Sequence, residues 1–111
     1  MQSKAAAVKG EPFDLAENVT YAIGSVVSKT LLKKDTGNIT LFSFAKGQGL
    51  SEHTSPYDAV VYILDGEARI SIGGKEQTVQ AGQMLIIPAD VPHALQADTQ
   101  FKMLLIMIRG E

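Results

Sequence analysis

The sequence predicts an all-β fold in a single domain, built from antiparallel strands that form a sandwich or a barrel. Eight apolar-rich runs recur along the chain, and short segments rich in Gly, Asp and Pro separate them. Strands repeating about every 8–12 residues are typical of such folds. No long stretch with the helical period competes with this pattern. The 111 residues suffice for one domain, because a second would be too small to build its own core.

The predicted strands follow one another with short turns between them. In chain order they cover residues 25–33, 39–45, 60–64, 68–72, 76–80, 84–88, 93–97 and 101–109. Two of the intervening dipeptides, Asp65-Gly66 and Gly73-Gly74, are predicted to form tight hairpin turns. Glycine accepts a positive φ without strain, and hairpin turns require it.

The chain before the strands is expected to differ from the rest. Residues 1–22 are predicted to form an N-terminal arm, and residues 23–111 the barrel. Within the arm, Asp14 is followed three residues later by Glu17, which is a helix-start signal. We therefore expect one helical turn over residues 14–18.

The composition excludes several classes of protein. Apolar residues make up 45% of the chain and charged residues 20%, as in ordinary globular domains. A net charge of −2 is too small to indicate a nucleic acid or a charged membrane as a partner, and neither is expected. The absence of cysteine excludes disulfides, thiolate metal sites and a cysteine nucleophile. No apolar run is long enough for a signal peptide or for the roughly 20 residues of a membrane span, so we expect a cytoplasmic protein.

Three strands are apolar on both faces. They are VVYIL at 60–64, MLII at 84–87 and MLLIMI at 103–108, and none of them alternates with polar residues. An antiparallel sheet with only one buried face would show that alternation. The second apolar face therefore needs a cover, and we expect a two-fold homodimer in which the same surface serves both subunits. The alternative is that the other sheet covers all of it.

Two segments carry a regular spacing of glycine, proline and histidine. The first holds Gly47, His53, Ser55, Ala59 and Gly66, separated by five, one, three and six residues. The second holds Gly82, Pro88, Asp90, His93 and Ala97, separated by five, one, two and three residues. This resembles the two motifs of the cupin superfamily, G-x5-H-x-H-x3-E-x6-G and G-x5-P-x-G-x2-H-x3-N, with a gap of fifteen residues as in short cupins. The resemblance implies a single-domain cupin, a double-stranded β-helix that forms a jelly-roll-like antiparallel barrel and is often dimeric.

The resemblance also implies a metal site, and half of its ligands are missing here. In metal-binding cupins the first motif supplies two histidines and a glutamate, and the second a third histidine, for Fe, Mn, Ni, Cu or Zn. His53 and His93 match the first and last of these ligands, whereas Ser55 and Ala59 replace the other two. Two imidazoles alone hold a transition metal weakly. Asp58, next to the glutamate position, is the one carboxylate that a small backbone shift could add.

A ligand pocket inside the barrel is the second expectation from the resemblance. Its predicted lining consists of His53, Ser55, Tyr57, Ala59, Val61, His93 and Met103. The pocket would be apolar with a few polar groups near its mouth, which suits a small organic ligand. No residue is assigned a catalytic role. The alternative for each histidine is a structural role at a strand end, with one ring nitrogen hydrogen-bonded.

Two functions agree with these features. The first is binding or sensing of a small organic molecule around His53 and His93, in a cupin of otherwise undefined function. The second is a divalent-metal-dependent enzyme, such as a dioxygenase or an isomerase, with an incomplete or atypical ligand set. The fold cannot choose between them, because it supports many reactions. A third function, the ligand-binding half of a transcriptional regulator, lacks support because the chain shows no helix-turn-helix segment.

Overall fold

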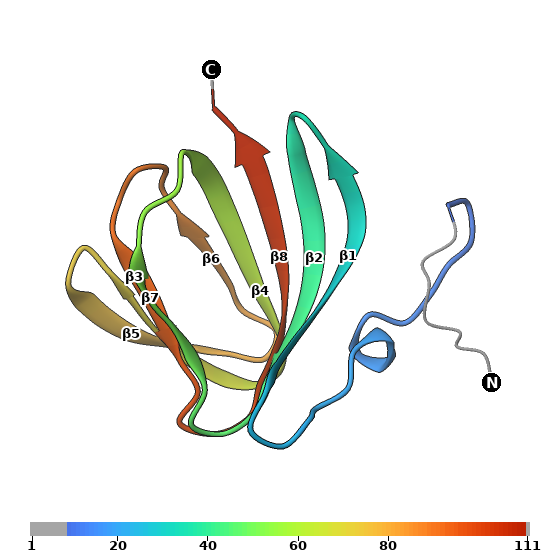
Figure 1. Cartoon of the computed structure of the whole chain (residues 1–111), viewed down its shortest axis with the longest axis horizontal. Coiled ribbons are helices and arrows are strands. Elements are labelled where there is room, and N and C mark those ends of the chain that lie inside the picture. Colours follow the sequence, from blue (N-terminus) through green and yellow to red (C-terminus); the bar gives the residue numbers. More distant parts are fainter. Residues whose placement is uncertain (1–8, 111) are drawn as a thin grey trace.

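A computed structural model describes residues 9–110 of the chain (Figure 1). Its elements are η1 (Ala16–Asn18), β1 (Val26–Lys34), β2 (Gly37–Phe44), β3 (Gly49–His53), β4 (Tyr57–Ile72), β5 (Lys75–Gln80), β6 (Met84–Ile87), β7 (His93–Gln96) and β8 (Phe101–Arg109). Every strand pair is antiparallel. The predicted all-β fold is therefore confirmed. Within the described residues, no helix has the length and apolar character needed to cross a membrane.

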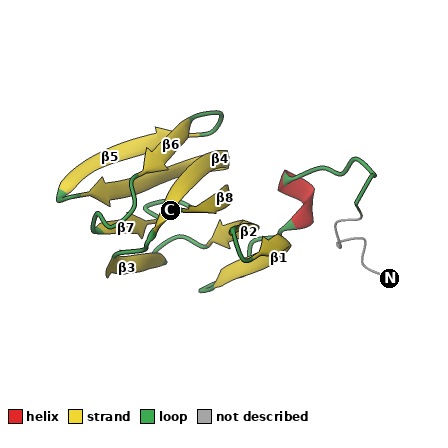
Figure 2. Ribbon diagram, turned by 90° about the horizontal axis from the view of Figure 1, so that it is seen from above, coloured by secondary structure: helices red, strands yellow, loops and turns green. Residues whose placement is uncertain are grey.

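The strands form two sheets that share one long strand. Sheet A has the order β1-β2-β8-β4-β6, and sheet B has the order β5-β4-β7-β3. The first part of β4 pairs with β8 and β6, and its second part pairs with β5 and β7. Figures 1 and 2 show the two sheets curling around a common interior. This is the jelly-roll-like barrel that the sequence predicts.

The prediction of a hairpin turn at Asp65-Gly66 is wrong. β4 runs through both residues for sixteen residues in all, and the chain bends there from sheet A into sheet B. The pairing with β8 shifts its register between Ile63 and Asp65, which marks a bulge. Gly66 has a φ of 75°, and a side chain there would collide with the carbonyl oxygen of Gln100. The glycine therefore serves a close approach of two strands at a corner instead of a turn.

The second predicted hairpin is confirmed. Gly73 and Gly74 have φ values of 57° and 85°, and they join β4 to β5 with Ile72 opposite Lys75. Positive φ at both central residues is the requirement of a tight type I′ turn. This hairpin sets the register of sheet B, and hence the position of β7, which pairs with the other edge of β4.

The expected set of strands omits β3, which carries one of the two histidines. β3 pairs with β7, placing Gly49 opposite Gln96 and Leu50 opposite Leu95. Its second half, Ser51 to His53, is exposed at the edge of sheet B. An edge strand with polar side chains lacks the apolar run by which the other strands are found. Ser55 lies beyond the end of β3 and is not on a strand.

The hydrophobic core lies between the two sheets. Phe44 and Phe101 are fully buried and stack with ring centroids 4.6 Å apart. Such a pair adds about 0.5–1.5 kcal/mol to the free energy gained by burying its area. The remaining buried members of this cluster are Ala59, Val61, Ile63, Ala68, Ile70, Val79, Ile87, Leu95, Ala97 and Met103. The cluster fills the interior and fixes the distance between the sheets.

The described part of the N-terminal arm packs against the outer face of sheet A. Its helical turn is η1, beside β1 and β2 in Figure 2, where the backbone N–H of Glu17 donates to Asp14 Oδ1 over 3.3 Å. The buried Ser43 hydroxyl donates to the carbonyl of Thr20 over 2.7 Å, and Lys102 Nζ donates to that of Ala16. These bonds anchor the end of the arm next to β1. Residues 1–8 of the predicted arm lie outside the described residues.

A tyrosine links the arm to the corner of β4. The phenol of Tyr21 donates a hydrogen bond to Asp65 Oδ2. Burial, and secondarily the hydrogen bond to the Asp65 carboxylate, raise the pKa of Tyr21 above its usual range. The ammonium group of Lys102 lies 5.1 Å from the centre of the same ring. The corner at Asp65 is therefore held from outside by the arm.

Candidate functional site

The two histidines of the chain meet at the ends of two paired strands. His53 is the last residue of β3, His93 is the first of β7, and their Cα atoms are register partners. The ring centroids lie 4.4 Å apart, with the ring planes at 61° in an edge-to-face arrangement. On the other side of β7, Ile72 is the partner of His93. The pair predicted from the sequence is thus brought together by the pairing of sheet B.

Each imidazole makes the same local hydrogen bond. Nδ1 of His53 lies 2.7 Å from the carbonyl oxygen of Ser51, and Nδ1 of His93 lies 2.9 Å from that of Val91. A carbonyl can only accept, so Nδ1 is the donor in both rings. In the neutral form this leaves a lone pair on each Nε2. Both Nε2 atoms are therefore able to accept a proton, a hydrogen bond or a metal ion.

The two rings differ strongly in burial. His93 is buried, with 6% of its surface exposed, whereas His53 is exposed to solvent. On β7 His93 shares its face with Leu95, which belongs to the core cluster, as does Ala97 just after the strand. A polar ring at this depth needs a hydrogen-bond partner, and the Val91 carbonyl supplies one. The pair thus spans from solvent to the edge of the core.

The loops that carry the two motifs are bound to each other beside this pair. The backbone N–H of Asp90 donates to the carbonyl of Ser55 over 2.7 Å. The Ser55 hydroxyl accepts from the backbone N–H of Tyr57 over 3.1 Å, so this side chain serves its own turn. Asp90 has a φ of 66°, at the position where the cupin motif has glycine. Aspartate is one of the few residues that adopt this left-handed conformation.

The carboxylate proposed as a replacement ligand lies elsewhere. Asp58 Oδ1 accepts the backbone N–H of Ala89 over 2.8 Å, and the Asp58 side chain is exposed. Alternation along β4 puts it on the face opposite to Ala59, which is buried in the barrel. Asp58 therefore does not join the two histidines. No cluster of three or more His, Cys, Asp or Glu side chains suited to a metal ion occurs between residues 9 and 110.

The remaining predicted pocket residues divide between the rim and the core. Tyr57 begins β4 and is half-buried, on the strand face that also carries Ala59 and Val61. Ala59, Val61 and Met103 are at most 3% exposed and belong to the core cluster. Leu50 on β3 and Ile72, the strand partner of His93, are partly buried side chains packed against the core. That all seven predicted residues line one ligand pocket stays a prediction.

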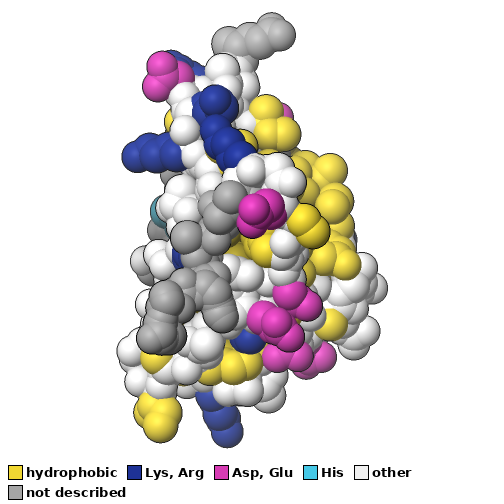
Figure 3. Space-filling model, turned by 90° about the vertical axis from the view of Figure 1, so that its right-hand side faces the viewer, with side chains coloured by type: hydrophobic (Ala, Val, Ile, Leu, Met, Phe, Trp, Pro, Cys, Tyr) yellow, Lys and Arg dark blue, Asp and Glu magenta, His cyan; other side chains and the backbone are white. Residues whose placement is uncertain are grey.

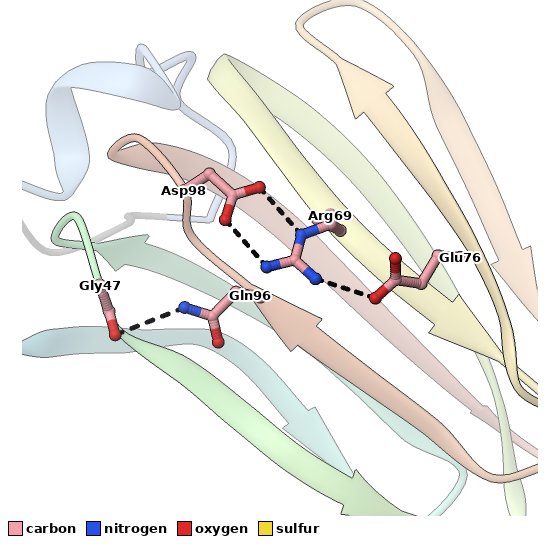
Figure 4. A network of polar contacts seen from close by, with 5 residues as sticks. All are labelled: Gly47, Arg69, Glu76, Gln96 and Asp98. Atoms are coloured by element: carbon pink, nitrogen blue, oxygen red, sulfur yellow. Dashed lines mark hydrogen bonds and ion pairs between the residues drawn. The ribbon is translucent and has the colours of Figure 1, made fainter.

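A polar network on the outer face of sheet B was missed in the sequence. Arg69 on β4 donates from Nε and Nη2 to both carboxylate oxygens of Asp98, each over 2.9 Å, and from Nη1 to Glu76 over 2.8 Å (Figure 4). The bond to Arg69 lowers the pKa of Asp98. Next to the network is a hollow of about 420 Å³, whose lining includes Ser51, Ser71 and Gln96. The strand pairing of sheet B brings these three charged residues together, although they are separated in the sequence.

These features define a class of protein: a small double-stranded β-helix with one histidine from each of two motif segments at adjacent strand ends. The family profile of the cupin domain matches residues 40–109, which is more than half of the chain. The protein therefore belongs to the cupin family.

Solved structures agree with this assignment. A conserved protein of unknown function from Streptococcus pyogenes is 37% identical, with a TM-score of 0.89, and the match covers 99% of this chain and 97% of that one. A cupin superfamily protein from Desulfitobacterium hafniense is 31% identical, with a TM-score of 0.87, over 99% and 100% of the two chains. A cupin 2 conserved barrel domain protein from Leptotrichia buccalis is 43% identical, with a TM-score of 0.85, over 87% of this chain and 47% of that one. No curated protein matches the sequence.

Proposed function

We propose that the protein binds a small organic molecule at the mouth of the barrel, through the Nε2 atoms of His53 and His93. The observation that carries the proposal is the shared hydrogen bonding of the two rings. Both Nδ1 atoms are used by backbone carbonyls, so both Nε2 atoms are left for a ligand. A ligand hydroxyl or carboxylic acid can donate to them, and a carboxylate can accept from an imidazolium.

The surroundings of the pair support a ligand that is apolar apart from one polar group. Leu50 and Ile72 are half-buried hydrophobic residues packed against the core, and Ile72 is the strand partner of His93. The half-buried Tyr57 shares the inner strand face with Ala59. Small-molecule sites commonly combine such apolar walls with a few convergent polar groups. We therefore favour a small carboxylic acid or phenol as the class of ligand.

The competing function is a divalent-metal-dependent enzyme of the dioxygenase or isomerase type. Bonding of Nδ1 to a carbonyl is the arrangement that metal-ligating histidines use, and it favours this function. The donor set does not fit a resident metal, however. A transition-metal site usually has three or more protein ligands, and the described residues place no third His, Cys, Asp or Glu beside the pair. The pair alone would therefore hold a transition metal only weakly.

The proposal is tested by NMR of the imidazole nitrogens. The chain has only two histidines, so the four ring nitrogens can be assigned with a single His53→Gln variant. The probes are benzoate, 4-hydroxybenzoate and hexanoate, each titrated into the 15N-labelled protein at pH 6 and pH 8. We expect at least one probe to shift both Nε2 signals in a saturable way.

Loss of that response in His53→Gln and in His93→Gln supports the assignment of the site. Asp35→Asn is a matched surface control, since Asp35 lies in the exposed turn between β1 and β2. Probes that shift neither Nε2 signal, or that bind the two glutamine variants as tightly as the wild type, contradict the proposal.

A further inference from the structure

The outer face of sheet B is polar, unlike the side of the molecule that carries the arm. On the arm side, hydrophobic side chains gather along part of the surface (Figure 3). Within residues 9–110 the exposed large hydrophobic residues are Phe13, Ile23, Met84, Ile86 and Ile108, and none of them lies on a strand segment of sheet B. Sheet B instead carries the hollow of about 420 Å³ beside its polar network. A ligand for this hollow is therefore expected to be polar.

The hollow forms because short side chains lie between long ones on this face. Its lining side chains on the outer face are Ser51, Arg69, Ser71, Glu76, Ala94 and Gln96. Ser71 has two register partners, Ala94 on one side and Glu76 on the other. Gln96 and Arg69 are partners in the neighbouring row. Ser71 and Ala94 thus form a floor, and the three long side chains border it.

A glycine keeps one side of the hollow open. Gly49 on β3 is the partner of Gln96 on β7. A Cβ atom at position 49 would collide with the carbonyl oxygen of Leu95 and would lie 3.0 Å from Gln96 Oε1. The Gln96 amide is oriented by Nε2, which donates to the carbonyl of Gly47 over 3.5 Å (Figure 4). Gln96 Oε1 is therefore left as an acceptor at the side of the hollow.

Arg69 is held in one orientation before any ligand arrives. Three of its five N–H groups donate to Asp98 and Glu76. The two carboxylates lie at different edges of the guanidinium plane, so its rotation is restricted (Figure 4). Two N–H groups, one on Nη1 and one on Nη2, remain for another acceptor. A fixed donor of this kind binds a ligand with less loss of side-chain entropy than a mobile one.

The groups that remain around the hollow include both donors and acceptors. Only Oε2 of Glu76 and Nε2 of Gln96 are hydrogen-bonded within the described residues, so Oε1 of each side chain can accept. The hydroxyls of Ser51 and Ser71 can donate and accept. A hydroxyl group on a ligand also does both. A molecule with several hydroxyls therefore matches this mixed set.

Charge argues against an ionic ligand. Arg69 has one positive charge, whereas Glu76 and Asp98 have two negative charges, so the network repels an anion. Both oxygens of Asp98 are bonded to Arg69, and an incoming cation would meet only Glu76. The Glu76 side chain is 59% exposed, and an ion pair at that exposure contributes little. A neutral ligand agrees best with these charges.

We propose that this hollow binds a neutral polyhydroxylated molecule of monosaccharide size, such as a hexose or a cyclitol. A volume of about 420 Å³ lies within the range of small-molecule sites. Ligand hydroxyls donate to the free oxygens of Glu76 and Gln96, and they accept from the remaining N–H groups of Arg69. The methyl group of Ala94 gives the C–H groups of the ring an apolar contact.

NMR titration of the 15N-labelled full chain tests this site. The probes are glucose, galactose, mannose, xylose and myo-inositol, with phosphate and ethanolamine as charged ligands for comparison. We expect at least one polyol to shift the backbone amide signals of Ser71, Ala94 and Gln96 in a saturable way, with a millimolar dissociation constant. Neither charged ligand should saturate these signals.

A matched pair of variants locates the binding. Ser71→Val should weaken it by about 10-fold or more, because the change removes a hydroxyl and fills the floor of the hollow. Valine is favourable in strands, so this variant should fold, and circular dichroism checks it. Thr78→Val is the control, since Thr78 is the exposed partner of Arg69 on β5 and lies outside the lining. It should bind as the wild type does.

Polyols that cause no saturable shift of these amide signals overturn the proposal. So does a folded Ser71→Val variant that binds as tightly as Thr78→Val. Tighter binding of phosphate or ethanolamine than of every polyol would make the hollow an ionic site, and would overturn the proposed class of ligand.

This site and the histidine pair fail or succeed separately. Ser71 and Ala94 lie on the outer face of sheet B, whereas the buried His93 shares the inner face with Leu95. His53→Gln should therefore leave the polyol titration unchanged. The imidazole probes are read at ring nitrogens, so their result does not depend on the amide signals of Ser71 and Ala94.

Discussion

His53 and His93 are register partners across β3 and β7, with ring centroids 4.4 Å apart and Nδ1 of each ring bound to the carbonyl two residues earlier. This relationship joins the two motifs, which are far apart in sequence, through one pair of short strands. It also makes the two rings unequal, because only His93 is buried. The two histidines therefore contribute differently to stability and to ligand binding.

The first prediction concerns that inequality. His93→Ala should lower the free energy of unfolding by about 1–3 kcal/mol, because it leaves a cavity and removes the partner of the Val91 carbonyl. His53→Ala removes an exposed ring, and it should change the free energy of unfolding by about 0.5 kcal/mol or less. Urea denaturation followed by circular dichroism measures both. If His53→Ala is destabilised as much as His93→Ala, then burial of the ring does not determine how much each histidine stabilises the fold.

The second prediction concerns the corner of β4. Gly66→Ala should lower the free energy of unfolding by roughly 3 kcal/mol. Gly66 has a positive φ, and the new methyl group collides with the carbonyl oxygen of Gln100. Gly74→Ala is the matched control: its φ is 85° but its surroundings are open. That change should cost about 1–2 kcal/mol. Thermal unfolding measures the loss of stability in each variant. Equal losses would mean that the bend in β4 adjusts to accommodate a side chain at Gly66.

These two glycines also show where sequence reasoning reaches its limit. Each of the dipeptides Gly73-Gly74 and Asp65-Gly66 contains a glycine with a positive φ, and each lies between apolar runs. One pair is a turn and the other a bend within a strand that changes sheets. The sequence signal, a glycine between two apolar runs, is the same in the two cases. Only the strand that passes beside Gly66 distinguishes them, and that contact lies thirty-five residues further along the chain, at Phe101.

The histidine site shows a similar limit. Motif spacing found both histidines, because a fixed spacing along strands implies a fixed position in the barrel. It did not find β3 as a strand, because GLSEH has little apolar character and lies at a sheet edge. Asp58 is adjacent to the expected glutamate position, but alternation along β4 turns its side chain to the other face. Side-chain direction thus depends on strand boundaries that the sequence places only approximately.

The third prediction concerns acid. The hydrogen bond to Arg69 lowers the pKa of Asp98 in the folded protein. The ion pair therefore stabilises the fold at pH values above about 4, the pKa of an aspartate in the unfolded chain. This stabilisation is lost as the pH falls through the lower pKa of Asp98 in the folded protein. Asp98→Asn should therefore lower the Tm at pH 7, and the difference from the wild type should shrink below about pH 4. Arg69→Gln should do the same. A difference between wild type and Asp98→Asn that does not vary with pH would contradict the assignment. Because the side chains are exposed, 1 M salt should weaken the effect.

The most direct measurement of the central claim is elemental analysis of the untagged protein, purified without chelators, beside His53→Ala and His93→Ala. If the pair is a small-molecule site, the wild type should carry well under one transition-metal ion per chain. Its Tm should also not rise with Mn²⁺, Ni²⁺ or Zn²⁺, since only a ligand that prefers the native state raises apparent stability. One metal ion per chain, lost in both alanine variants, would contradict the account and establish a metal centre at His53 and His93.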